Sequence, residues 1–179
     1  MIDLDLPDPL GGGGRGLPQG GAATTDRDNG VQHRFALSVE GPHARGRADK
    51  WLAASAETKR CSGWMLVAAM AMCDEATPDS WFLTRLAELE KTLQASPNAR
   101  RQAMLSALIA IGGRNKALRK AATAVAHKIG TVEIDHGDTS CKTPEFMATL
   151  EKTWARATSK GFESPAAQER ARESMRTRC

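Results

Sequence analysis

The sequence has 179 residues, of which 41% are hydrophobic, 26% are charged and 4% are aromatic, and its formal net charge is +4. This composition is typical of a single globular domain with a core of its own. Tyrosine is absent, which disfavours all-β folds built from aromatic-rich strands. No apolar run approaches the roughly 20 residues of a membrane helix, and the N-terminus lacks a secretory signal pattern. We expect a cytoplasmic protein without a membrane partner.

The N-terminal segment differs in composition from the rest of the chain. Residues 1–30 hold 8 of the 16 glycines. Such a segment cannot bury enough apolar surface to offset its backbone entropy. Residues 1–43 carry six acidic and three basic residues, a net charge of −3, which leaves +7 for residues 44–179. We predict a disordered or foreign tail over residues 1–41 and a folded helical repeat domain, itself incomplete, over residues 42–179.

From Pro42 onward, apolar residues recur at helical spacing between Pro, Ser and Gly residues. The pattern predicts helices over residues 43–56, 60–73, 79–94, 97–112, 115–129 and 143–158, and a polar one from 164 onward. Gly112 and Gly113 are expected to end the fourth of these. The four central helices form two short-looped pairs whose first members start 37 residues apart, near the roughly 40-residue period of HEAT-type repeats. We predict an all-α superhelical solenoid of antiparallel HEAT-like helix pairs.

Basic residues gather in the stretch 96–130, which contains no Asp or Glu. Its seven bases are Arg100, Arg101, Arg114, Lys116, Arg119, Lys120 and Lys128. Arg100 and Arg101 fall in the first turn of a predicted helix, where the helix dipole disfavours cations, so an external anion is indicated. The segment 112–115 is a candidate phosphate seat, because free amides lie at a helix start. The stretch therefore favours a nucleic-acid face; the alternative is a solvated face whose acids lie on adjacent helices.

One polar cluster runs from Glu133 to Cys141 and combines carboxylates, an imidazole and a thiol. Its spacing matches no metal-ligand pattern, and His136 and Cys141 are too close in sequence to form a productive catalytic pair readily. A turn between helix pairs is the simplest interpretation; a metal site and a pocket or DNA contact are the alternatives. We predict no metal and no cofactor, and we expect the four cysteines to be reduced thiols.

Three of the four tryptophans, Trp64, Trp81 and Trp154, occupy apolar positions of predicted helices. Large aromatic side chains at such positions most often pack in the core. We therefore predict core packing for all three rather than a base-stacking surface.

Four blocks of the chain together resemble the bacterial DNA alkylation repair family of HEAT-like repeat proteins. They are PHARGRADKW, RCSGWMLVAAMAM, ALIAIGGRNKALRKAA and IGTVEIDHGDTSCKTP, within residues 41–155. The resemblance implies a curved helical solenoid that binds duplex DNA on a basic concave face. Characterised members are DNA glycosylases that excise N3- or N7-alkylated purines, so the implied partner is duplex DNA with alkylated bases. The chain resembles the C-terminal part of a family member.

The resemblance transfers DNA contacts more readily than catalytic residues. Arg60 falls near a DNA-facing arginine of active members, and it joins the basic residues of the stretch 96–130. The predicted DNA-binding residues are Arg60, Arg100, Arg101, Arg114, Lys116, Arg119 and Lys120. The family's aspartate and one tryptophan lie upstream of Pro42, where this sequence does not match, and Ser106 stands in the place of a second tryptophan. We predict DNA binding and leave excision open.

Two alternatives remain from the sequence. The first is a non-enzymatic helical-repeat scaffold for protein partners, since a fold does not fix a function. It predicts that Arg100, Arg101, Arg119 and Lys120 do not converge on one face. The second is a truncated fragment without function, whose first repeat would leave Trp51 and Leu52 without cover.

Overall fold

The computed structural model describes residues 43–138 and 142–176, which form seven α-helices and no β-strand. The helices are α2 (Ala44–Leu52), α3 (Glu57–Cys73), α4 (Asp79–Thr92), α5 (Asn98–Arg114), α6 (Lys116–Ile129), α7 (Phe146–Ser159) and α8 (Pro165–Arg176). The all-α prediction is therefore confirmed. The tail predicted over residues 1–41 lies outside the described residues.

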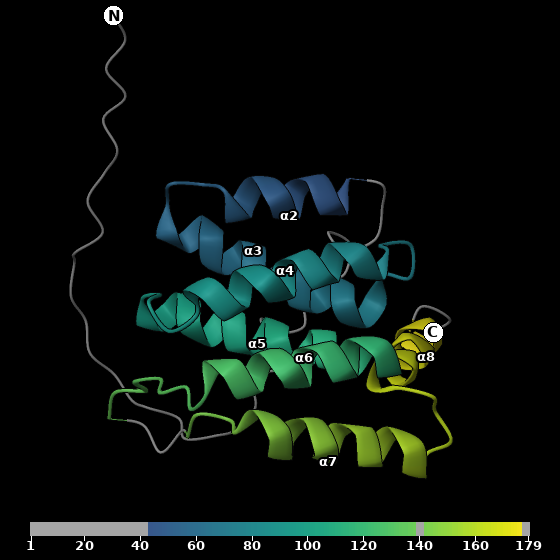
Figure 1. Ribbon diagram of the computed structural model, residues 1–179. Helices are drawn as coiled ribbons and strands as arrows, with labels where there is room; N and C mark the ends of the chain where they lie inside the picture. The colour runs from purple at the N-terminus through teal and green to yellow at the C-terminus, as the bar shows by residue number, and fades with distance from the viewer. Residues whose placement is uncertain (1–42, 139–141, 177–179) are drawn as a thin grey trace, which may run out of the picture.

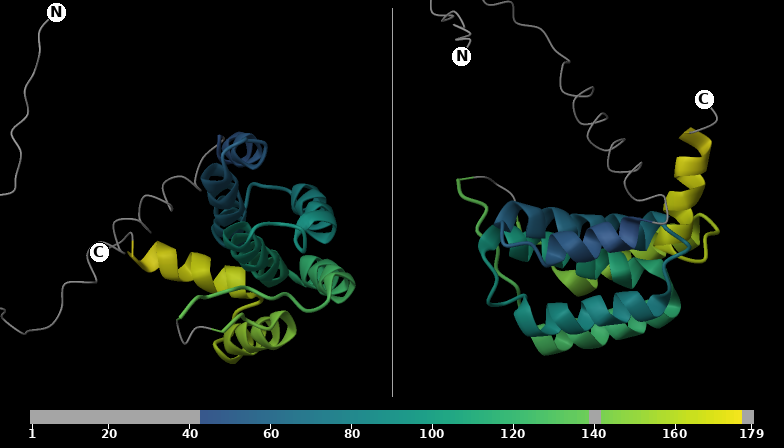
Figure 2. Two further views of the ribbon diagram at one scale, coloured as in Figure 1. Left: turned by 90° about the vertical axis from the view of Figure 1, so that its left-hand side faces the viewer. Right: turned by 90° about the horizontal axis from the view of Figure 1, so that it is seen from above.

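The two central pairs are α3–α4 and α5–α6, each made of antiparallel helices, and they stack so that α3 lies beside α5 and α4 beside α6 (Figure 1). The end-on view in Figure 2 places α3 and α5 side by side at the centre, with α4 and α6 as a second layer on one side. Helix α2 packs on α3 at one end of the stack and α7 packs on α5 at the other. Helix α8 lies on the opposite side from α4 and α6, where it contacts α3, α5 and α7.

The core lies between the two layers and is built from the apolar stripes of the central helices. Its largest fully buried side chains are Leu66, Met70, Phe82, Leu86, Leu89, Leu93, Met104, Leu108, Ile111, Leu118 and Leu150. Trp64 and Trp154 are buried as predicted. Trp81 is only half-buried, because its indole Nε1 reaches the surface and donates to the Asp49 carboxylate at 3.2 Å.

The prediction that Gly112 and Gly113 end their helix is wrong, since α5 continues through both to Arg114. Both glycines are buried, and their lack of a side chain lets other helices approach. A Cβ on Gly112 would lie 3.0 Å from Cδ1 of Leu150 on α7. A Cβ on Gly113 would lie 3.4 Å from Pro165, the first residue of α8. Here glycine serves close packing rather than helix termination.

Candidate nucleic-acid interface

The structure places Arg114, a predicted DNA contact, in the interior, where its side chain is 8% exposed. Its Nη1 donates to the carbonyl oxygen of Asp74 at 2.6 Å, and its Nη2 donates to that of Thr77 at 2.9 Å. Its Nε lies 3.4 Å from an Asp79 carboxylate oxygen, and its guanidinium carbon is 4.6 Å from the Phe82 ring centroid. Arg114 thus joins the end of α5 to the end of α3, and we leave it out of the candidate interface.

The predicted phosphate seat over residues 112–115 also has another use in the structure. A single residue, Asn115, separates α5 from α6, so no loop is present there. The Asn115 side-chain oxygen accepts a hydrogen bond from the Leu118 amide at 2.9 Å, which is the ordinary N-cap interaction. The Asn115 side-chain nitrogen donates to Asp79 at 2.8 Å. At least one free amide at the start of α6 is therefore capped from within the chain.

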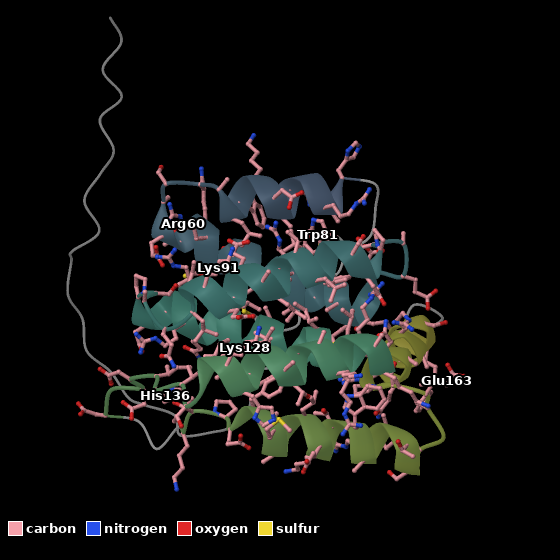
Figure 3. All side chains as sticks on the ribbon, in the orientation of Figure 1. Arg60, Trp81, Lys91, Lys128, His136 and Glu163 are labelled. Atoms are coloured by element: carbon pink, nitrogen blue, oxygen red, sulfur yellow. The ribbon has the colours of Figure 1, made fainter. Side chains whose placement is uncertain are left out.

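Arg60 and Arg100 are half-buried and each has a partner near the start of α3. The Nε atom of Arg60 donates to the carbonyl oxygen of Ala54 at 2.5 Å. The Nε atom of Arg100 lies 2.9 Å from the Glu57 carboxylate, which neutralises its charge. Figure 3 shows Arg60 at the end of the molecule where His136 lies, far from Glu163.

Arg101 binds the segment that follows α6. Its Nη1 donates to the carbonyl oxygen of Glu133 at 2.7 Å, and its Nη2 donates to that of Ser96 at 3.1 Å. Asn98 strengthens the attachment, because it exchanges two hydrogen bonds of 2.6 and 2.8 Å with the backbone of Asp135. The positive charge of Arg101 at the start of α5 therefore serves to bind backbone carbonyl groups of this protein.

The polar segment 133–138 forms a turn, as the simplest interpretation predicted. Asp135 accepts a hydrogen bond from the Gly137 amide at 2.8 Å, and Gly137 has a φ of 60°, which favours glycine. The Nε2 atom of His136 lies 3.3 Å from the Thr143 hydroxyl. Cys141 lies outside the described residues. Within residues 43–138 and 142–176, no group of three or more His, Cys, Asp or Glu side chains could hold a metal ion.

The remaining predicted contacts, Lys116, Arg119 and Lys120, lie together at the start of α6. They line a hollow of about 340 Å³ between α6 and α7. Lys116 and Lys120 are exposed, and neither has an ion-pair partner among the described residues. Lys116 and Arg119 lie in the first turn of α6, near the positive end of its dipole, where each positive charge costs up to about 1 kcal/mol. An anion bound in the hollow would offset this electrostatic cost.

Helix α7 supplies the other wall of this hollow, which the sequence reasoning did not include. The guanidinium carbon of Arg119 lies 4.8 Å from the ring centroid of Trp154 and is thereby held toward α7. Met147, Leu150 and Glu151 line the hollow from the same helix. The sequence signal for this wall is the spacing of three and four residues between these positions, which places them on one side of α7. We call the surface formed by Lys116, Arg119 and Lys120 the α6–α7 basic face.

The structure does not bring the two groups of predicted contacts together. Arg100 and Arg101 lie at the start of α5, whereas Arg119 and Lys120 lie at the start of α6. Because α5 and α6 are antiparallel and joined at Asn115, these two starts are at opposite ends of the pair. The candidate interface is therefore confined to the α6–α7 basic face.

Ser106, on the surface of α5, provides no aromatic ring. Its side chain is half-buried, and its hydroxyl donates to the carbonyl oxygen of Gln102 at 3.0 Å, within the same helix. Trp64 and Trp154 are buried and offer no exposed ring face for a cationic base.

No protein-family model matches the chain. A curated relative, described as the uncharacterized protein Lin0241 of Listeria innocua, is 28% identical over 105 residues, which are 59% of this chain and 45% of the relative. A solved structure matches with a TM-score of 0.61 and 23% identity, over 73% of this chain and 56% of the other. That structure is described as belonging to a new family of proteins related to the HEAT-like repeat DNA glycosylases, with affinity for branched DNA structures.

The chain has the HEAT-like repeat fold. The predicted resemblance to HEAT-like repeat proteins is confirmed at the level of the fold, because the solved structure matches 73% of this chain with a TM-score of 0.61. The chain spans about half the length of the two proteins it matches. Among the described helices, none is both long and apolar enough to cross a membrane.

Proposed function

We propose that this protein binds duplex DNA through the α6–α7 basic face. The observation that carries the proposal is that Lys116, Arg119 and Lys120 line one hollow, with the two lysines unneutralised by the described residues. Lysine and arginine side chains that neutralise phosphates supply most of the non-specific affinity of proteins for DNA. The DNA affinity of the solved HEAT-like relative supports the choice of partner.

The proposal is for binding to duplex DNA, including DNA with alkylated bases, without efficient excision of the base. Excision needs a group that holds the cationic base and a carboxylate that stabilises the sugar cation. Ser106 supplies no ring, and among the described residues Glu151 is the single carboxylate that lines the hollow. Phosphate contacts alone position a duplex but perform no chemistry on it.

The binding test uses fluorescence anisotropy with a labelled duplex. The double variant Lys116→Glu/Lys120→Glu should weaken binding by about tenfold or more, because two attractive charges become repulsive. The matched control is Lys91→Glu/Lys160→Glu, which makes the same charge change at two exposed lysines that do not line the hollow. Equal weakening by both double variants would refute a specific face. A four-way junction, included because of the relative's affinity, reports whether branching adds to the affinity.

The excision test follows base release from duplex DNA that contains 7-methylguanine. We expect no release above the spontaneous rate of the same DNA without protein. Base release at a clearly higher rate would show that the chain performs the chemistry with residues outside the α6–α7 basic face.

A protein-interaction scaffold is the second candidate, and one observation favours it. That hypothesis predicted that Arg100, Arg101, Arg119 and Lys120 do not converge, and the structure places them at opposite ends of the α5–α6 pair. The two hypotheses separate in the binding test. Absence of salt-dependent DNA binding would favour the scaffold, whereas binding that depends on Lys116 and Lys120 would favour DNA.

A further inference from the structure

A second basic hollow, of about 720 Å³, runs along the exposed side of α2 and reaches the first turn of α3. Its lining includes His43, Arg47, Lys50 and Lys59, and Trp51 lies among them. Among the described residues, no acidic side chain lines it. We call this surface the α2 hollow.

The cations of the α2 hollow follow one stripe of the helix. His43, Arg47 and Lys50 are spaced by four and three residues, so they lie above one another on successive turns, about 5–6 Å apart. Lys59 extends the row onto α3. Lys50 and Lys59 are exposed and have no ion-pair partner among the described residues. The two exposed lysine charges on this surface suit the phosphates of a nucleic acid.

The carboxylates of this part of the chain are engaged elsewhere. Asp49 accepts from the Trp81 indole at 3.2 Å and lies 3.7 Å from the Arg85 guanidinium. Glu57 pairs with Arg100 on α5 at 2.9 Å. Both acids therefore pair with neighbouring helices, and neither forms an ion pair with Lys50 or Lys59.

Trp51 adds an aromatic wall to this row of charges. The side chain is half-buried, because it packs partly against the core and partly lines the hollow. Its indole N–H has no hydrogen-bond partner among the described residues. An indole that is partly accessible beside basic side chains is the combination that binds single-stranded nucleic acids, since every base can stack on an aromatic ring. A paired base inside a duplex has no free face to offer.

We infer that the α2 hollow binds an unpaired segment of DNA, with phosphates on Lys50 and Lys59 and a base stacked on Trp51. A missing protein helix fits this surface poorly, because the exposed stripe is charged rather than apolar. The inference goes beyond the proposed duplex binding and does not depend on it. The α2 hollow and the α6–α7 basic face belong to different parts of the stack, because α2 packs on α3 at one end and α7 packs on α5 at the other (Figure 1).

The experiment measures fluorescence anisotropy with a labelled oligothymidylate of about 12 nucleotides, which cannot pair with itself, and with a blunt duplex. Lys50→Glu/Lys59→Glu should weaken binding of the oligothymidylate by about tenfold or more and leave duplex binding within about twofold. Lys116→Glu/Lys120→Glu should do the reverse. The control Lys91→Glu/Lys160→Glu should change neither by more than about twofold.

The role of Trp51 is tested by Trp51→Leu and Trp51→Phe. Loss of the ring should weaken oligothymidylate binding by about fivefold or more, and the phenylalanine variant should recover most of it. Thermal melting of each variant shows that it is folded, and duplex binding serves as a second measure of a native fold. Equal losses for oligothymidylate and duplex would overturn the inference. So would unchanged oligothymidylate binding in Trp51→Leu together with equally strong heparin binding, since this pattern identifies a general polyanion surface.

Discussion

The Nη1 atom of Arg114, the last residue of α5, lies 2.6 Å from the carbonyl oxygen of Asp74, which follows the end of α3. The carbonyl oxygens at a helix end have no partners within the helix. Arg114 supplements the bonding at this helix end, because the same nitrogen also lies 3.2 Å from the Ala71 oxygen and 3.3 Å from the Met70 oxygen, which accepts from the Asp74 amide as well. One buried cation thus closes α3 and fixes its distance from α5.

Arg114→Leu should lower the free energy of unfolding by about 3 kcal/mol, because buried carbonyl groups lose a charged donor that water cannot replace. Urea denaturation measures the change. The control is Arg172→Leu on α8, where the arginine is exposed and its ion pair with Glu169 is worth little. DNA binding by the folded fraction should remain. A variant of unchanged stability that binds DNA poorly would show that Arg114 contacts DNA after all.

The α6–α7 basic face makes a quantitative prediction about salt. Each phosphate contact contributes about 0.9 to the slope of log K against log salt concentration. Lys116→Gln/Lys120→Gln should therefore reduce the steepness of that slope by roughly 1.8 for a duplex. Anisotropy titrations between about 50 and 200 mM salt measure it. A weaker but equally steep dependence would mean that the two lysines act through the fold and not through phosphates.

The sequence predicts the helices well because their causes are local. Apolar spacing, prolines at starts and Gly130 at the end of α6 all act within one helix, and the predicted ranges agree with the structure to within a few residues. Gly112 and Gly113 show the limit. Two consecutive glycines have the same local sequence pattern whether they end a helix or allow another helix to pack closely against them. Which of these occurs depends on α7 and α8, whose contacting residues lie 38 or more positions further along the chain.

The candidate site was predicted less well for a related reason. A count of charges along the chain does not distinguish a cation that caps a distant helix end from one that faces solvent. Three of the predicted contacts bind within the protein instead. Arg100 pairs with Glu57, Arg101 binds the segment after α6, and Arg114 binds the end of α3. The spacing of residues 43, 47 and 50 places them on one helix face, but only the structure shows that this face lines a hollow.

The thiol of Cys61 should react slowly at neutral pH. Burial raises the pKa of Cys61, and the nearby Glu57 carboxylate raises it further. A raised pKa leaves less thiolate at a given pH, and the thiolate is the nucleophile. Alkylation by iodoacetamide, followed at this residue by mass spectrometry, should be slower than for free cysteine and should accelerate as the pH rises above the ordinary thiol pKa.

The variant Glu57→Gln checks the cause of this shift. Removal of the carboxylate should lower the pKa of Cys61 and speed its alkylation at a given pH, because the charge of Arg100 then acts on the thiolate without opposition. The same pKa shift adds stability that is complete below the ordinary thiol pKa and is lost as the pH rises through the raised value. Identical alkylation rates in the two proteins would leave burial as the whole cause.

Two glycine-to-alanine substitutions should have opposite effects on stability. Gly112→Ala should lower the free energy of unfolding by about 1–3 kcal/mol, because the new Cβ would lie 3.0 Å from Leu150 and 3.3 Å from Ala122. Gly46 lies on the exposed side of α2, and no atom would lie within 4 Å of the Cβ that Gly46→Ala adds. Its higher helix propensity should raise the free energy of unfolding by up to about 1 kcal/mol.

Because both substitutions add the same methyl group to a helix interior, their difference isolates the close approach of α7 from intrinsic helix propensity. The prediction is checked by urea denaturation of both variants beside the parent protein. The fluorescence of Trp154 provides a second measurement, since its indole Nε1 donates to the Gly112 carbonyl oxygen at 3.0 Å in the buried contact between α5 and α7. Gly112→Ala should therefore also shift the emission of this tryptophan. A stabilising effect at both positions would mean that α7 can move away from α5 at little cost.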